Sequence, residues 1–307
     1  MSPGMTADRY ARFLPSEFRV DHAPTSTMWP WRGESIHVAR ARNDDAPFRV
    51  LAIHGAGGHS GALWPYAALA ASRGADVLFP DMPLYGKTVV STPGEVRYQH
   101  WVDMLCDLVV AERQRDSRPI VMFGASMGGM LAYEVASRTG EVADVLATCL
   151  LDPSDPDARS AAARFGVLGR PAPMLLEACA SVFGRVRVPV RWLMDVGNMS
   201  GNSELSRQCA TDPLGGGVSV PIGFLSSFMS YEHVRPEAYD GPAVTLVHPA
   251  EDRWTPPEVS IRFLERVAGP TSLVMLEGCG HFPIEQPGLS QLVDVVESMA
   301  RKYGWAP

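Results

Sequence analysis

Short apolar segments alternate with amphipathic helical segments along most of this chain of 307 residues. Continuous apolar runs predict strands at residues 48–54, 75–80, 119–123 and 143–151, and helices are expected between them at 62–73, about 95–116 and 127–139. Strands that are hydrophobic throughout must be covered on both faces, as in a parallel sheet between two layers of helices. The sequence therefore predicts an α/β fold, with a mostly parallel central sheet and helices on both faces.

The alternation stops after residue 153 and resumes near residue 241. Further strands are expected at 243–248 and 271–276 and further helices near 256–267 and 288–303, while residues 35–42 alternate like an antiparallel edge strand. The intervening segment is partly helical, rich in Met, Phe and Leu, and broken by three glycines at 215–217. We expect residues 1–153 and 241–307 to form the core and residues 154–240 to form an inserted helical cap.

Charge and composition exclude several classes of protein. The 34 acidic residues outnumber the 27 Lys and Arg residues, and the net charge of -7 gives no basic surface for nucleic acid. The first twenty residues lack the apolar core of a secretory signal, and no run reaches the roughly eighteen apolar residues that a spanning helix needs. The expectation is a cytoplasmic protein without stable membrane insertion. Five scattered cysteines without a C-x-x-C pair predict free thiols.

One serine lies at the junction of a predicted strand and a predicted helix. The segment PIVMFGASMGG places Ser126 between Gly124 and Gly128. A nucleophile on such a sharp turn needs small residues two before and two after it, because the backbone leaves no room for side chains. The following helix begins beside the serine oxygen, and its free N–H groups favour a developing negative charge. Ser126 is therefore a candidate nucleophile.

A serine hydroxyl needs a base to take its proton and a carboxylate to orient that base. His281 follows the last predicted strand, and Asp252 follows the strand before it. Both positions fall at the carboxyl ends of strands, where sites assemble in open parallel sheets. His281 is the candidate base and Asp252 the candidate acid, with Glu251 and Asp152 as alternatives for the acid.

The glycine-rich turn after the first core strand can supply an oxyanion hole. It reads His54-Gly55-Ala56-Gly57-Gly58, and its backbone N–H groups can face the cleft beside Ser126. The expected donors are the N–H groups of Ala56 and Met127. His54 itself is expected to be a structural hydrogen-bonding residue of the turn.

These motifs together resemble the α/β-hydrolase fold, and within it the serine hydrolases of the monoglyceride lipase and lysophospholipase group. The resemblance lies in HGAGGHS, DMPLYG, GASMGG, AEDRWTPP and GCGH, and it covers the sheet from about residue 48 to the end; ATDPL at 210–214 is also similar to a cap segment of that group. It implies the roles given above for Ser126, Asp252, His281, Ala56 and Met127. Three residues depart from the family pattern without removing a catalytic atom: Ala125 where His is usual, and Leu84 and Pro249 where Gly is usual.

The expected function is a serine hydrolase that cleaves a carboxylic ester of a small or lipid-like apolar substrate through an acyl-enzyme, with no cofactor and no metal. Thioester hydrolysis, carbon–carbon bond hydrolysis on the same residues and non-catalytic ligand binding remain as alternatives. A dinucleotide site fails at Ser60, where the third glycine would stand, and a phosphate-binding loop fails at Asp81. The partner expected is a small-molecule ester, and the oligomeric state is left open.

Overall fold

The computed structural model describes residues 9–162, 172–193 and 199–306. Its centre is an eight-stranded sheet of order β1-β2-β4-β3-β5-β6-β9-β10. The strands are β1 Thr25–Trp31, β2 Glu34–Ala41, β3 Arg49–Ile53, β4 Asp76–Pro80, β5 Ile120–Gly124, β6 Val142–Ala147, β9 Val244–Pro249 and β10 Thr271–Leu276. The β1–β2 and β2–β4 pairs are antiparallel, and all other pairs are parallel. The predicted α/β fold is confirmed.

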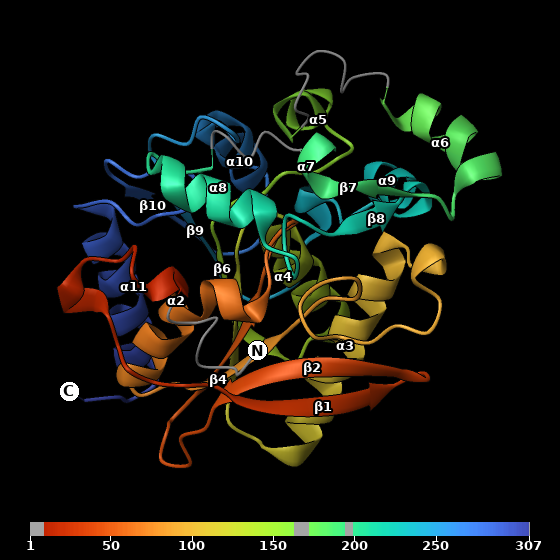
Figure 1. Cartoon of the computed structure of the whole chain (residues 1–307). Helices are drawn as coiled ribbons and strands as arrows, with labels where there is room; N and C mark the ends of the chain where they lie inside the picture. The colour runs from red at the N-terminus through yellow and green to blue at the C-terminus, as the bar shows by residue number, and fades with distance from the viewer. Residues whose placement is uncertain (1–8, 163–171, 194–198, 307) are drawn as a thin grey trace.

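Helices cover both faces of this sheet (Figure 1). One face carries α2 Ser60–Ser72 and α11 Gly288–Lys302; the other carries α3 Tyr98–Arg115, α4 Met127–Thr139 and α10 Pro257–Leu264. Short 3-10 helices lie at Ser16–Phe18, Pro93–Glu95 and Pro236–Ala238. Within the described residues, no helix combines the length and the apolar character needed to cross a bilayer.

The described residues of the segment between β6 and β9 form five α-helices and two short strands, which lie at one end of the sheet in Figure 1. Its elements are α5 Pro156–Ala162, α6 Ala172–Phe183, β7 Arg187–Pro189, α7 Val190–Leu193, α8 Ser203–Thr211, β8 Ser219–Pro221 and α9 Ile222–Met229. Strands β7 and β8 pair antiparallel in a sheet of their own. On α9, the Phe224 ring packs 4.7 Å from that of Trp101 and Phe228 packs 5.2 Å from Tyr98, ring centroid to ring centroid. These aromatic contacts attach the segment to α3.

The largest difference from the predicted boundaries is the end of β6. The apolar run predicts a strand as far as residue 151, but β6 ends at Ala147. The Thr148 N–H still donates to the Gly124 carbonyl at 3.0 Å, whereas the Leu150 N–H donates to the Ser260 hydroxyl at 3.0 Å. The chain therefore leaves the sheet because side-chain acceptors replace the neighbouring strand, which hydropathy alone does not reveal.

Leu84 adopts a backbone conformation that favours glycine. Its φ is +84°, a value that glycine reaches freely and that a branched side chain reaches only with strain. The resembling family has glycine at this position. The departure noted in the sequence is thus a strained residue in the loop after β4.

Candidate active site

Ser126 lies on a strained turn between β5 and α4. Its φ of 55° and ψ of -124° are far from those of ordinary strands and helices. A Cβ added at Gly124 would lie 2.1 Å from the Gly128 carbonyl oxygen, and one added at Gly128 would lie 2.5 Å from the Ile53 oxygen. Both glycines are therefore required by close backbone contact, which confirms the reason for which the sequence singled them out.

Two hydrogen bonds donated by backbone N–H groups hold this turn in place. The Ala125 N–H donates to the Ile53 carbonyl at 2.9 Å, and the Ser126 N–H donates to the Thr148 hydroxyl oxygen at 2.9 Å. Thr148 follows β6 directly, so the neighbouring strand supports the serine from the side. Sequence reasoning missed Thr148, because a threonine after an apolar strand carries no distinctive signal.

His281 and Asp252 meet although they come from different loops. Asp252 follows β9 and His281 follows β10, and His281 Nδ1 lies 2.7 Å from Asp252 Oδ2. Asp252 is 4% exposed. The Trp254 ring packs 4.6 Å from the His281 ring, centroid to centroid. The structure therefore brings together the imidazole and the carboxylate that the sequence paired.

The Asp252 carboxylate is fully engaged by hydrogen-bond donors. Oδ1 accepts the N–H groups of Trp254 and Thr255, both at 2.9 Å, and Oδ2 accepts the Thr255 hydroxyl at 2.6 Å in addition to His281. Burial raises the pKa of this carboxyl, but the facing His281 and the Thr255 donors outweigh burial and lower the pKa to about 2. Asp252 is therefore ionised at neutral pH. Thr255 is a supporting residue that the sequence did not identify.

The two alternative acids lie elsewhere. Asp152 faces His233, with 3.7 Å between Asp152 Oδ1 and His233 Nδ1, and also accepts the Ser154 hydroxyl at 2.6 Å. Glu251 has an exposed side chain. Among the three acids weighed from the sequence, only Asp252 is hydrogen-bonded to His281.

The turn after β3 lies directly against Ser126. A Cβ added at Gly55 would stand 2.7 Å from Ser126 Cβ. The Ala56 and Met127 amides donate no hydrogen bond to other groups in the described ranges, and Met127 is the first residue of α4. The first N–H groups of a helix have no partner within the helix. Both amides are therefore free to receive an acceptor atom next to Ser126.

His54 has a structural role in this turn. Its Nδ1 lies 2.8 Å from the Gly55 carbonyl oxygen, and its Nε2 accepts the Met82 N–H at 3.0 Å. Complete burial lowers the pKa of His54 to about 4, against the smaller opposing effect of Asp81. The imidazole is therefore neutral, with Nδ1 as donor and Nε2 as acceptor.

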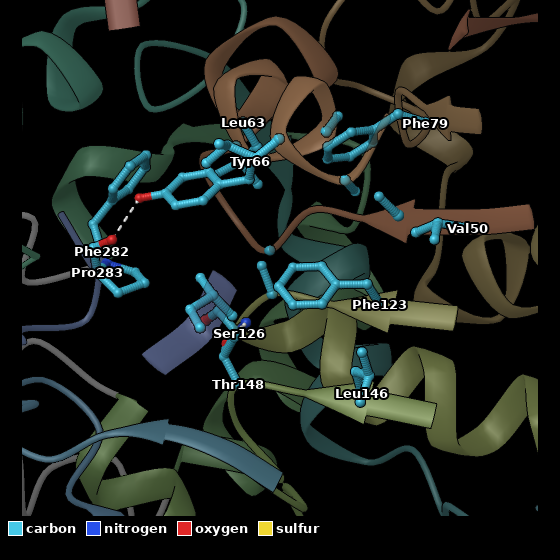
Figure 2. A pocket seen from close by; sticks show the side chains of 18 of the residues that line it. Val50, Leu63, Tyr66, Phe79, Phe123, Ser126, Leu146, Thr148, Phe282 and Pro283 are labelled. Atoms are coloured by element: carbon cyan, nitrogen blue, oxygen red, sulfur yellow. Dashed lines mark hydrogen bonds between the residues drawn. The ribbon is translucent and has the colours of Figure 1, made fainter. Parts of the chain in front are cut away.

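Ser126 and His281 line the same pocket, together with the turn after β3. Figure 2 shows Ser126 in this pocket. Other walls come from α2, α11 and the strands, and nearly all of their side chains are apolar. At the His281 side, the Tyr66 hydroxyl donates to the Pro283 carbonyl at 2.9 Å and ties α2 to the loop that carries His281. Ser126 and His281 thus face an apolar chamber.

A second Ser–His–Asp chain lies outside this pocket. Ser26 Oγ is 3.0 Å from His37 Nε2, and His37 Nδ1 is 2.7 Å from Asp81 Oδ2. Asp81 also accepts the N–H groups of Ser60 and Lys87 at 2.7 and 2.8 Å. Ser26 lies within the antiparallel strand β1, so it lacks the sharp turn and helix N-terminus that Ser126 has. Its position makes it a natural control for Ser126.

One group of potential metal ligands coincides with the His281–Asp252 pair. Ligand atoms of Cys149, Asp252 and His281 lie within 4.8 Å of one another. The carboxylate and the imidazole are already hydrogen-bonded to each other, and burial raises the pKa of the Cys149 thiol well above its usual range. A metal would have to displace that hydrogen bond and deprotonate the thiol, so this donor set fits a metal poorly.

The class of this protein follows from its eight-stranded sheet, the serine on its strand–turn–helix unit and the histidine after β10. Residues 50–289 match the family model described as the alpha/beta hydrolase family. The chain belongs to this family. No curated protein sequence matches the chain significantly.

Several solved structures share this fold at low sequence identity. A soluble variant of monoglyceride lipase from Saccharomyces cerevisiae, in complex with a substrate analogue, has a TM-score of 0.74 and 16% identity over 94% of this chain and 99% of that one. A monoacylglycerol lipase from Paleococcus ferrophilus has a TM-score of 0.69 and 19% identity over 88% and 99%. Est1E from Butyrivibrio proteoclasticus, with ferulic acid bound, has a TM-score of 0.60 and 16% identity over 90% and 98%. Monoglyceride lipases, to which the sequence motifs point, are thus among the structures that share its fold.

Proposed function

We propose that this protein is a serine hydrolase that cleaves a carboxylic ester of an apolar substrate. The observation that carries the proposal is the position of Ser126, on a strained turn in a pocket that it shares with His281, whose Nδ1 is bound by the ionised Asp252. A neutral imidazole held in this way leaves Nε2 free to accept a proton. The lipases among the solved structures that share this fold are consistent with ester hydrolysis.

In the proposed mechanism, His281 takes the proton of the Ser126 hydroxyl as Oγ attacks the ester carbonyl carbon. The Ala56 and Met127 N–H groups hold the negative oxygen of the tetrahedral intermediate, and Asp252 stabilises the imidazolium. When the intermediate collapses, the bond to the alcohol oxygen breaks and His281 returns the proton to that oxygen. Water, deprotonated by His281, then hydrolyses the acyl-enzyme and regenerates Ser126.

The segment 154–240 is proposed to be the cap of this active site. Asp212, beyond α8, accepts the Tyr10 hydroxyl at 2.6 Å and lies 3.3 Å from His59 Nε2. His59 also caps the N-terminus of α2, since its Nδ1 accepts the Gly61 N–H at 3.2 Å. This contact supports a fixed position for the segment next to the turn that carries Ala56.

The test compares Ser126→Ala with Ser26→Ala on a short p-nitrophenyl ester. We expect Ser126→Ala to lower kcat by at least about a thousandfold and Ser26→Ala to leave it near the wild-type value. A fluorophosphonate probe is expected to form one adduct, on Ser126. A non-catalytic ligand-binding protein would give neither hydrolysis nor an adduct. An adduct on Ser26 would show that Ser26, and not Ser126, is the nucleophile. Matched oxygen esters and thioesters then decide between the ester and thioester reactions.

A further inference from the structure

An apolar cavity extends from Ser126 into the interior of the core. It lies between the sheet and the helices α2 and α11, with a volume of about 130 Å³ (Figure 2). Protein interiors are normally packed with few voids larger than a water molecule. A cavity of this size that begins at the proposed nucleophile therefore calls for an occupant.

The walls of the cavity come from alternate residues on one face of the sheet and from small residues on α2. The strands contribute Val50 and Ala52 of β3, Val77 and Phe79 of β4, Val121 and Phe123 of β5 and Leu146 of β6. Helix α2 contributes Ala62, Ala67 and Ala70 among others. Phe123 lies on a central strand and yet is only partly buried, because its ring faces this cavity. The space thus results from alanines where larger side chains would fill the layer.

The described residues of the segment 154–240 contribute little to this chamber. Among its described residues, only Met199 and Cys209 line the cavity. Its aromatic residues Phe224 and Phe228 are instead packed against Trp101 and Tyr98 on the opposite side of the sheet. Within the part of the chain that the structure describes, the apolar space next to Ser126 is therefore built mainly by the core.

We propose that this cavity binds the acyl group of the substrate, as a chain or ring of about six carbon atoms. This inference rests on the proposed function. A dry engineered cavity of about 150 Å³ in another protein binds benzene, which sets the scale for a guest in a cavity of this volume. The acyl group stays bonded to Ser126 through both half-reactions, whereas the alcohol must leave before water enters. An internal chamber suits the group that is retained.

The far end of the cavity supports this assignment. Arg73 follows α2 and lines the cavity together with Met299 of α11. The Arg73 Nε donates to Glu297 Oε1 at 2.9 Å, and the two side chains are 28% and 26% exposed. A charged pair at this end disfavours an apolar chain that extends further, so acyl groups longer than the cavity are expected to react more slowly.

The test compares p-nitrophenyl acetate, hexanoate and dodecanoate as substrates of the wild type and two α2 variants. We expect the wild type to prefer hexanoate to acetate by up to the order of 100-fold in kcat/KM, since each buried methylene contributes about fourfold. Ala67→Leu, which fills the cavity, should reduce this ratio at least tenfold. Ala71→Leu places the same side chain on the same helix outside the cavity and should leave the ratio unchanged.

A third variant should shift the preference for acyl-chain length in the opposite direction. Leu146→Ala enlarges the cavity, and its chain-length optimum should move above six carbons, a gain that an unfolded protein does not produce. Cooperative thermal unfolding and phosphonate labelling of Ser126 show that each variant is folded. If both Ala67→Leu and Leu146→Ala still hydrolyse esters with the wild-type preference for acyl-chain length, the cavity is not the acyl site. The proposed hydrolase function would then still stand. A wild type without ester hydrolysis or label overturns the proposed function itself.

Discussion

His281 Nδ1 lies 2.7 Å from Asp252 Oδ2, and the same carboxylate oxygen accepts the Thr255 hydroxyl at 2.6 Å. A hydrogen bond from Nδ1 to a carboxylate leaves Nε2 of the neutral ring as an acceptor, which is the tautomer that a general base requires. The two residues are 29 positions apart in sequence and come from loops after neighbouring parallel strands. The β9–β10 pairing therefore brings the Asp252 carboxylate to the imidazole of the proposed base.

Replacing Asp252 tests this relationship. Asp252→Asn keeps the shape of the side chain but removes its charge and favours the wrong tautomer of His281, so kcat is expected to fall about 10⁴-fold. Asp152→Asn is the matched control, because Asp152 contacts His233 instead. Ester hydrolysis by both purified variants, with circular dichroism as the check of folding, decides the question. A larger loss in Asp152→Asn would contradict the assignment.

Thr255→Val tests the hydrogen bond that the Thr255 hydroxyl donates to Asp252. The variant removes one hydrogen bond to a charged group, an interaction of about 1.5–3 kcal/mol, while keeping the volume of the side chain. We expect the pKa of Asp252 to rise and kcat to fall about tenfold, with KM little changed. Thr255→Ser restores the hydroxyl and should restore most of kcat. Equal losses in the Val and Ser variants would mean that packing, and not the hydrogen bond, is what matters at this position.

The same variant changes acid stability in a defined direction. The folded pKa of Asp252, about 2, lies below its ordinary value of 3.8, so its ionised form contributes stability above pH 3.8 that is lost as the pH falls toward 2. In Thr255→Val the folded pKa should lie closer to 3.8, so the loss should be smaller and complete at a higher pH. Urea unfolding between pH 2 and pH 5 measures the shift.

The order of the parallel strands from β3 onward, and of the helices between them, could be read from the sequence because largely apolar strands alternate with helical segments. Strand β2 could be read from its alternation, whereas the range of β1 could not, because most of this edge strand is exposed. The turn at Ser126 could also be read, since Gly124 is required by contact with Gly128 within one strand–turn–helix unit and Gly128 by contact with Ile53 of the neighbouring parallel strand β3. Asp252 and His281 could be placed because each lies in the loop after a strand. In each case the feature depends on interactions between residues close in sequence, or on the parallel pairing of neighbouring strands.

The features that could not be read depend on packing between distant segments. Thr148 and Thr255 support Ser126 and Asp252 through hydroxyl groups that are common in any sequence. The Ser26–His37–Asp81 chain arises from pairing of β1 with β2 and of β2 with β4, and no motif announces it. Whether apolar side chains fill a layer or leave a cavity depends on how α2 and α11 sit on the sheet.

Gly124→Ala tests how tightly the serine turn is packed. The added methyl group would lie 2.1 Å from the Gly128 oxygen, a backbone atom that cannot rotate away. We expect a loss of about 2 kcal/mol or more in the free energy of unfolding, together with loss of ester hydrolysis. Gly280→Ala is the control, since its nearest neighbour would be 3.6 Å away although it lies next to His281. Thermal and urea unfolding of both variants compare the two positions, and equal stability would show that the turn can adjust.

His54→Gln tests the buried neutral imidazole through the pH dependence of stability. The folded pKa of His54 is about 4 and its ordinary value is 6.5, so between these values the unfolded chain binds a proton that the folded protein does not. The contribution of neutral His54 to the free energy of unfolding is therefore fully present above pH 6.5. It is lost as the pH drops toward 4, by about 3 kcal/mol in total. The Gln variant cannot titrate, so its stability should change by about 3 kcal/mol less across this window, whatever its absolute value.

The matched control for that slope is His22→Gln, because the His22 side chain is exposed. Its unfolding free energy between pH 4 and pH 7 should follow that of the wild type. Asp252 does not interfere, since its contribution is lost only below pH 3.8. If His54→Gln kept the wild-type slope, the proton that destabilises the protein in mild acid would bind elsewhere, and His54 would not be the neutral residue that fixes the turn beside Ser126.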